Sequence, residues 1–302
     1  MTGGVVPFSW NIVTDLRTMW EFNFMRNAFE AGTIIAIVAG IIGYFVVLRR
    51  SAFATHALGH VGFSGAAGAV LFGVNPVYGL LLFTTSGATG MGLLGRRASN
   101  RDLEIGTVLA FMLGLGLLFL SLYTGYATEA YSILFGEILG ISNGGVIFTL
   151  EASVVVLVVM ALIYRRLLFA SLDEDVAEAK GMPMLALGVT FMILLAVAIS
   201  IAVQVIGVLL IFALMVTPAA VAVRLTKRPL YAAVVSVLVA LTATWVGLFV
   251  QFYAQYPASF FIVSIAFAIY VAVRVGQALS AWLVHRNVPV AEPHSSADRE
   301  SA

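Results

Sequence analysis

Two histidines of the chain, His56 and His60, stand four residues apart in the segment SAFATHALGHVGFSG. In a helix this spacing places both imidazole rings on one face, with their Cβ atoms about 5–6 Å apart. Neutral imidazole nitrogens are ligands for Zn, Cu, Fe and Ni, so the pair could bind one transition-metal ion. The alternative is that both rings bond carbonyls or water near a helix end. The spacing alone leaves both interpretations open.

The composition of the chain defines the environment in which these histidines act. Of 302 residues, 61% are hydrophobic and only 10% are charged, against about 25% charged in soluble domains. The net charge of +1 offers no basic surface for a nucleic-acid partner. The chain has no cysteine, which excludes disulfides and thiolate metal sites. The fold class that remains is an all-α polytopic integral membrane protein.

The apolar segments predict where the helices lie. A transmembrane helix needs about 20 mostly apolar residues. Nine segments meet this requirement, which predicts a bundle of about 8–9 transmembrane helices within residues 26–284. The segments are 27–48, 56–73, 76–95, 106–124, 145–164, 184–202, 205–223, 230–252 and 258–279. Residues 130–142 are too short to span, and we expect a re-entrant or interfacial helix there, or the start of the next span.

Lysine and arginine predict the orientation, because they concentrate in cytoplasmic loops of membrane proteins. They follow alternate segments, as at Arg49 and Arg50, and the intervening loops contain none. This pattern places the N-terminus outside and the C-terminus in the cytoplasm. The exceptions, Arg17 and Arg26, lie in or beside residues 1–25, which mix aromatic and charged residues as an interfacial helix does. Residues 285–302 are polar and predict a disordered cytoplasmic tail.

Three glutamates fall on the outer side in this topology. A carboxylate there could steer or bind an arriving cation, although a hydrated acid at a helix end is the simpler interpretation. The simpler interpretation is favoured for Glu30 and Glu151. Glu137, in ILFGEILGIS, is retained as a candidate metal ligand.

Small residues and one proline shape the apolar segments. GFSGAAG, which begins at Gly62, permits close helix packing, a narrow path or a helix break. Pro218 removes a backbone hydrogen bond within its segment and predicts a helix kink.

The polar stretch FASLDEDVAEAKGMP predicts a short cytoplasmic helix over about 171–182. Ser171 is the expected N-cap, Asp173 and Glu174 fill the first turn, and Gly181 ends the helix. A plain connector and a docking helix for a partner would both show this pattern.

No motif for catalysis is found in the sequence. Its two lysines, Lys180 and Lys227, lie outside any phosphate-binding G-x-x-x-x-G-K-[ST] sequence, and there is no G-x-S-x-G or H-E-x-x-H. We therefore predict that the chain is not an enzyme, and that any ATP it depends on is hydrolysed by another subunit.

Four stretches resemble, in family order, the permease subunit of zinc/manganese ABC importers, the ABC-3 family. FVVLRRSAFATHALGH is similar to paired arginines followed by Asp-Ala-Leu-Ser-His, and ILFGEILGIS to Leu-Phe-Gly-acid-Ile-Leu. SLDEDVAEAKGMP is similar to the coupling helix, and QVIGVLLIFALMVTPAAVAVRL to a Val-Gly-x-Leu-Leu…Pro-Ala-Ala segment. Together they cover most of the chain, from about Met25 to Arg274.

The resemblance implies a homodimer of permease chains in the cell membrane, ATP-binding subunits on the cytoplasmic side and an extracytoplasmic metal-binding protein. The cargo would be Zn²⁺ or Mn²⁺, with no permanently bound cofactor. The coupling helix would contact the ATPase through residues that include Ser171, Asp173, Glu174, Ala177 and Gly181.

One departure from the family pattern affects the choice of metal. His60 matches the histidine of the family motif, whereas His56 stands where the family has aspartate. A His/His pair favours Zn²⁺ and an Asp/His pair favours Mn²⁺. We therefore expect zinc to be the first candidate for the transported metal and manganese the next. The alternatives are a permease for a metal chelate of siderophore or cobalamin type, an ion-coupled secondary carrier, and a non-transporting scaffold.

Overall fold

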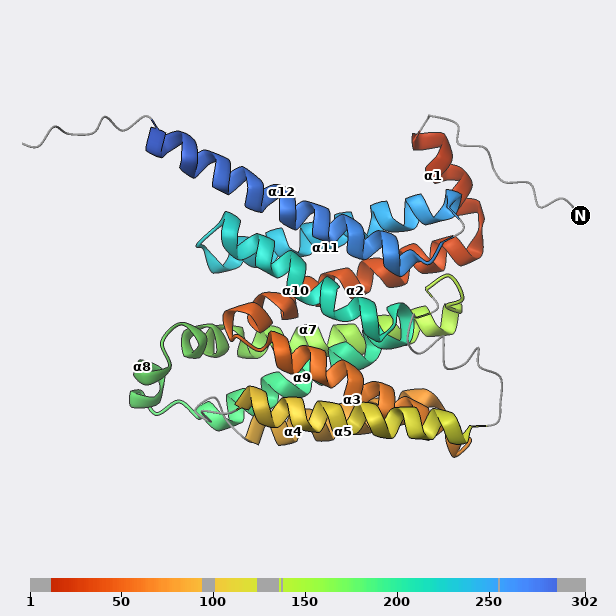
Figure 1. Cartoon of the computed structure of the whole chain (residues 1–302), viewed down its shortest axis with the longest axis horizontal. Helices are drawn as coiled ribbons and strands as arrows, with labels where there is room; N and C mark the ends of the chain where they lie inside the picture. Colours follow the sequence, from red (N-terminus) through yellow and green to blue (C-terminus); the bar gives the residue numbers. More distant parts are fainter. Residues whose placement is uncertain (1–11, 94–100, 124–135, 137, 255, 287–302) are drawn as a thin grey trace, which may run out of the picture.

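The computed structural model describes residues 12–93, 101–123, 136, 138–254 and 256–286. Within these ranges every regular element is a helix, and the long helices lie side by side along one axis (Figure 1). The helices are α1 (Ile12–Glu21), α2 (Asn23–Leu48), α3 (Ala52–Leu71), α4 (Pro76–Leu93), α5 (Arg101–Leu122), α7 (Asn143–Leu172), α8 (Glu174–Ala179), α9 (Met184–Ile206), α10 (Val208–Leu225), α11 (Pro229–Tyr253) and α12 (Ala258–Arg286).

Six of the described helices are long and apolar enough to cross a membrane: α2, α5, α7, α9, α11 and α12. This supports a polytopic helical membrane protein. The expected 8–9 spans are not reached by length and composition alone, because α3, α4 and α10 fall outside that set. α3 contains the two histidines and several glycines, α4 contains glycines and threonines, and α10 has only 18 residues.

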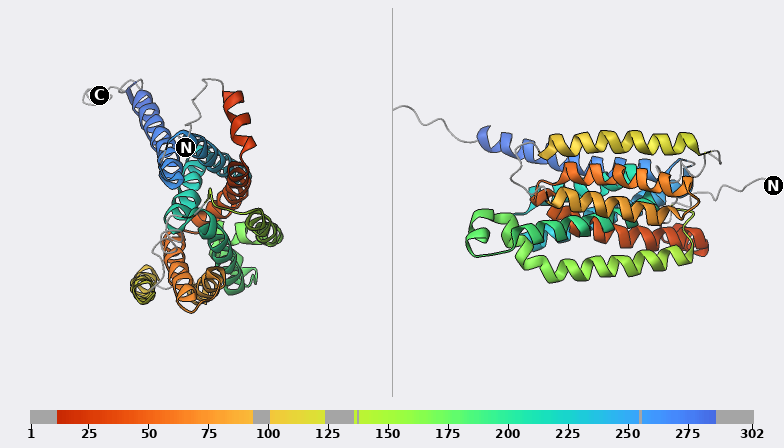
Figure 2. Two further views of the ribbon diagram at one scale, coloured as in Figure 1. Left: turned by 90° about the vertical axis from the view of Figure 1, so that its right-hand side faces the viewer. Right: turned by 90° about the horizontal axis from the view of Figure 1, so that it is seen from below.

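The helices differ in how deeply they lie in the bundle. The most apolar windows of α2 and α9 are each 67% buried, whereas those of α5 and α12 are 11% and 17% buried. Seen from the end, α5 and α12 lie at the edge of the bundle (Figure 2). α5 packs against α3, and α12 packs against α10 and α11. Among these six helices, α2 and α9 therefore form the middle of the bundle.

The small residues of α3 serve close packing. α3 is unbroken from Ala52 to Leu71, so the GFSGAAG segment, where a helix break was one of the alternatives, is helical throughout. A methyl group on Gly65 would overlap the backbone of Gly79 on α4, and the converse also holds. The two backbones can touch only because both residues are glycine.

The break in the helical path lies instead between α9 and α10, at Gly207. We expected the second of these spans to begin near residue 205, but α9 continues to Ile206. Gly207 has φ +80° and ψ 165°, a conformation that only glycine adopts readily. Pro218 lies inside α10, and helix continues on both sides of it to Leu225.

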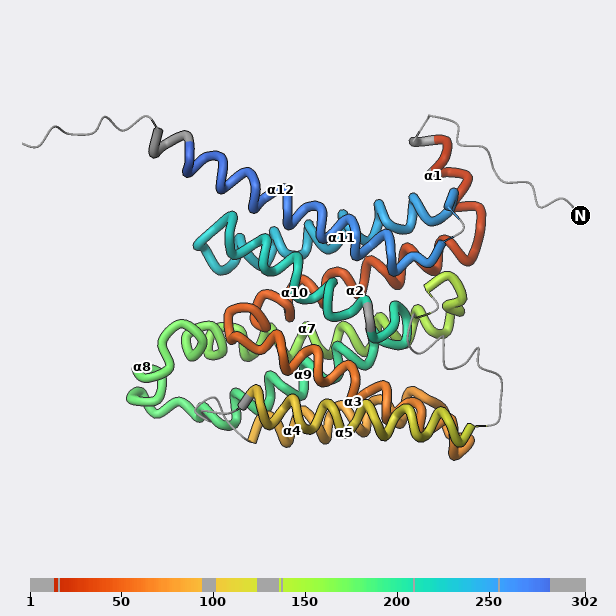
Figure 3. Tube along the Cα trace, viewed as in Figure 1, coloured from red at the N-terminus to blue at the C-terminus, as the bar shows by residue number. Residues whose placement is uncertain are grey.

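The chain reverses between α2 and α3 at Arg49, Arg50 and Ser51, as the tube in Figure 3 shows. α8 and the end of α12 lie at one end of the bundle, and α1 lies at the other (Figure 1). The two ends of the described chain therefore face opposite directions along the bundle axis.

Candidate functional site

The histidine pair lies in the first half of α3, on one face of the helix. The ring centroids of His56 and His60 are 4.7 Å apart, with the ring planes at 81°. Both side chains are half-buried. At about 1.5 Å rise per residue, they lie about 6 and 12 Å from the helix start at Ala52. The structure therefore brings together the two nitrogen donors that the spacing predicted.

α10 forms one wall beside this pair. The His56 ring meets the Phe212 ring edge-on, with centroids 5.1 Å apart. Gly59, between the histidines, faces Val208 at the start of α10, where an added Cβ would lie 3.3 Å from the valine Cγ1. The face of α3 that carries the imidazoles is thus turned toward the beginning of α10.

The Nδ1 atom of His60 is buried, and no hydrogen-bond partner is found for it among the described residues. Buried polar atoms are nearly always paired, so this ring nitrogen is a donor atom still open to a ligand. The backbone carbonyl of His60 accepts a hydrogen bond of 3.1 Å from the Ser64 hydroxyl, which also contacts the carbonyl of Met112 on α5. These contacts fix the turn of α3 that carries the ring.

A complete metal site needs more than two donors. Within the described residues, no group of three or more His, Cys, Asp or Glu side chains could hold a metal ion. The third candidate ligand, Glu137, lies outside the described residues. Its neighbour Gly136 is described, with φ +72°, and a Cβ there would overlap the backbone at Ile206 and Gly207. Gly136 is therefore in contact with the break between α9 and α10.

The predicted cytoplasmic helix is shorter than expected, and a different residue caps it. α7 continues to Leu172, so Ser171 lies in the last turn of α7 and does not cap α8. Asp173 is the N-cap, and its carboxylate accepts a 3.0 Å hydrogen bond from the Val176 amide. The interpretation of Ser171 as the cap was wrong because α7 carries buried side chains as far as Ala170.

Small apolar contacts hold α8 against the bundle. Ala177 is fully buried and forms a cluster with Ala170 and Leu187, while Glu174 at the first position of α8 is half-buried. Gly181, with φ +74°, ends the segment as its sequence predicted. α8 is thus a short, fixed helix outside the main bundle.

One residue near α8 was assigned no site role from the sequence. Arg49 is 5% exposed, its Nη1 donates a 3.2 Å hydrogen bond to the Ser171 hydroxyl, and its guanidinium lies 5.3 Å from the centre of the Phe191 ring. In the sequence, Arg49 and Arg50 indicated orientation and formed part of the family resemblance. Arg49 therefore ties the α2–α3 turn to the end of α7 and to α9.

Comparison with known sequences identifies the class of this bundle. The sequence profile of the ABC 3 transport family matches residues 21–277. Because this match covers most of the chain, the protein belongs to the ABC 3 transport family. It is a multi-pass membrane protein, and among the alternatives considered the secondary carrier is set aside by this membership.

Individual relatives agree with this family. The chain is 30% identical over 214 residues to the manganese transport system membrane protein MntC of Listeria monocytogenes, covering 70% of this chain and 76% of that one. It is 32% identical over 206 residues to the manganese import system permease protein ScaB of Streptococcus parasanguinis, covering 67% and 72%. Among solved structures it resembles PsaBC from Streptococcus pneumoniae in complex with Fab, with a TM-score of 0.77, 26% identity, and coverage of 87% and 95%.

Proposed function

We propose that the chain is the permease subunit of an ATP-driven importer of divalent transition-metal ions. The observation that carries this proposal is the pair of His56 and His60, whose imidazoles share one face of α3. The buried Nδ1 atom of His60 lacks a hydrogen-bond partner within the described residues. Membership in the ABC 3 transport family supplies the transport class, and two relatives are named for manganese import. An intramembrane pair of imidazoles is a site for an ion in transit.

Manganese and zinc are the two candidate cargoes. The names of the relatives favour Mn²⁺. The donor set favours Zn²⁺, because two imidazoles suit zinc better than the harder Mn²⁺. We propose a site that accepts both ions, with His56 weakening the preference for manganese.

Glu137 is proposed as a further ligand. Its described neighbour Gly136 touches the backbone at Gly207, and the next residue, Val208, touches Gly59 between the histidines. These contacts form a short chain from the Glu137 segment to the histidine pair. A carboxylate added to two imidazoles would give a set that both zinc and manganese accept.

We further propose nine membrane crossings, with α3, α4 and α10 included. These three helices pack within the bundle against α9, and each is at least 18 residues long. An odd number of crossings agrees with α1 and the end of α12 lying at opposite ends (Figure 1). The arginine-rich end that carries α8 is the proposed cytoplasmic side, with the N-terminus outside.

Three partners complete the proposed importer. A separate ATP-binding subunit docks on α8, whose rigid attachment through Ala177 suits the transmission of force. A second copy of the chain packs against α5 and α12, the least buried of the six long apolar helices. An extracytoplasmic protein delivers the metal ion at the opposite end.

The proposal is tested in a strain that lacks this chain and keeps its partner subunits. We expect that restoring the chain restores uptake of radiolabelled Mn²⁺ or Zn²⁺, and that a catalytically dead partner ATPase abolishes the effect. A siderophore–iron complex and cobalamin, supplied in parallel, test the chelate alternative. Unchanged uptake of both metal ions on deletion would refute the proposal.

The His56→Asp variant tests the choice of metal. It restores the aspartate of the family motif, so we expect the ratio of Mn²⁺ to Zn²⁺ uptake to rise several-fold, while total transport continues. His56→Asn, which has similar size without a charge, is the matched control. An unchanged ratio in both variants would show that His56 does not select the metal.

A further inference from the structure

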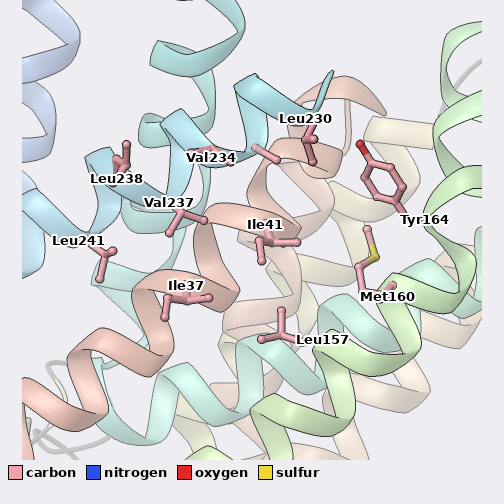
Figure 4. Close-up of a pocket in the computed structure, with 12 residues that line it drawn as sticks. Ile37, Ile41, Leu157, Met160, Tyr164, Leu230, Val234, Val237, Leu238 and Leu241 are labelled. Carbon is pink, nitrogen blue, oxygen red and sulfur yellow. The ribbon is translucent and has the colours of Figure 1, made fainter. Parts of the chain in front are cut away.

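An apolar groove lies on the bundle surface between α2, α7 and α11 (Figure 4). Its volume is about 590 Å³, within the range of about 300–1,000 Å³ typical of ligand sites. Twelve side chains line it, of which eleven are aliphatic or methionine, and Tyr164 is the exception. Ile41 comes from α2, Met160 from α7 and Val237 from α11, so the groove follows the line where α7 and α11 both flank α2.

Basic residues gather at one end of this groove. Leu230, at the start of α11, and Tyr164, near the end of α7, lie together at that end (Figure 4). Arg165 follows Ala161 of the lining by four residues, and so continues the same helix face. Lys227 and Arg228 directly precede α11.

These basic side chains are available to an anion. Arg165, Lys227 and Arg228 are exposed. Arg228 lies over the Tyr231 ring, 5.7 Å from its centre. Within the part of the chain that the structure describes, no carboxylate pairs with Arg165. The groove is therefore electrically neutral along its length and positively charged at one end.

We propose that this groove binds one anionic phospholipid, with an acyl chain between α7 and α11 and the headgroup phosphate at Arg165, Lys227 and Arg228. Lipid tails are as apolar as the groove, so burial of a tail supplies little selectivity in a membrane. Selectivity for an anionic lipid comes from the attraction between its phosphate and the basic residues. This attraction contributes about 1 kcal/mol for each Lys or Arg near the membrane surface. An anionic lipid is thus the occupant that both parts of the groove match.

A second copy of the chain is the competing occupant, and other helices suit it better. α5 and α12 expose more of their apolar surface than α7 and α11, whose most apolar windows are 28% and 39% buried. The three basic groups at this end of the groove would also face the same groups of a symmetric partner, which like-charge repulsion disfavours.

The test uses the full-length chain with whichever partner subunits co-purify. The protein is reconstituted in nanodiscs of phosphatidylcholine with a minor fraction of phosphatidylglycerol, extracted in mild detergent, and analysed by native mass spectrometry. We expect phosphatidylglycerol to be retained in preference to phosphatidylcholine. Inorganic phosphate alone should not compete, because it has no acyl chain.

Two variants separate the two halves of the site. Arg165→Gln removes one charge, and we expect the preference for phosphatidylglycerol to fall by about fivefold. Val234→Trp fills the groove and should remove both lipids. Arg274→Gln on α12 and Leu82→Trp at an exposed position of α4 are the matched controls, and neither should change retention. Thermal midpoints confirm that each variant is folded.

Single-cysteine variants test the competing occupant, because the native chain has no cysteine. Leu238→Cys in the groove should give little disulfide-linked dimer in native membranes. Efficient crosslinking at that position would show a second copy on this surface and overturn the proposal. Lipid retention that ignores headgroup charge, or that is unchanged in both Arg165→Gln and Val234→Trp, would also overturn it.

Discussion

The contact between α3 and α4 and the groove between α7 and α11 are both apolar, yet one is closed and the other is open. Gly65 and Gly79 bring the backbones of α3 and α4 into direct contact. In the groove, branched side chains such as Val234 and Leu238 line a space of about 590 Å³. Side-chain size, rather than hydrophobicity, decides which helix pairs close in a membrane.

The tightly packed α3 and the open groove suit two different kinds of ligand. On the closed side, α3 is held by neighbours on several faces, which fixes His56 and His60 within 4.7 Å of each other. A metal ion needs donors fixed to a few tenths of an ångström, and rigid packing supplies them. On the open side the lining is smooth and apolar, which suits a flexible acyl chain.

Removing the unpartnered ring on the closed side should have the largest effect. We expect His60→Ala to lower metal uptake by at least the roughly tenfold to 100-fold that loss of a residue supporting a metal ligand costs. Radiolabelled uptake, normalised to membrane levels of the chain, measures this. Leu238→Ala in the groove is the matched truncation and should transport normally. Wild-type uptake in His60→Ala would show that His60 does not bind the transported metal ion.

Adding one methyl group at the closest helix contact tests the packing itself. Gly65→Ala should destabilise the protein by about 1–3 kcal/mol, because the methyl group overlaps the backbone of Gly79. Gly90→Ala on α4 is the control, since nothing lies within 4 Å of a Cβ there. Equal thermal midpoints for the two variants would show that α3 and α4 are not packed through Gly65.

α8 connects α7, which lines the groove, to α9 in the middle of the bundle. Its N-cap, Asp173, can be tested by substitution. Asp173→Ala should cost α8 about 1 kcal/mol and lower the metal moved per ATP hydrolysed. Asp173→Asn, which caps equally well, should retain coupling. The measurement is ATPase and transport in one proteoliposome preparation. If Asp173→Asn is as uncoupled as Asp173→Ala, the charge matters and the cap does not.

The smallest effect is expected in the groove. Leu238→Ala removes a side chain that is 56% exposed, so the free energy of unfolding should change by less than about 0.5 kcal/mol. Leu195→Ala on α9 removes a fully buried side chain and should cost about 2 kcal/mol or more. Thermal unfolding of both variants in one detergent gives the comparison. A similar loss in both would show that the groove is closed in the native protein.

The sequence predicted the features that depend on residues close together in the chain. Composition set the membrane environment, since 10% charge cannot cover a soluble surface. The four-residue spacing put both imidazoles on one helix face, and Gly181 marked the end of the polar segment. The cap was misplaced from Asp173 to Ser171, because the number of turns that α7 continues depends on what Ala170 packs against.

Only the tertiary structure shows which residues distant in the sequence contact one another. The sequence could not show that Val208 faces Gly59, that Arg49 reaches Ser171, or that the chain breaks at Gly207 rather than within α3. Helical periodicity determines which face a residue occupies but not which neighbour that face meets. That choice depends on how the side-chain shapes of several helices fit together, and the same fit leaves α7 and α11 apart.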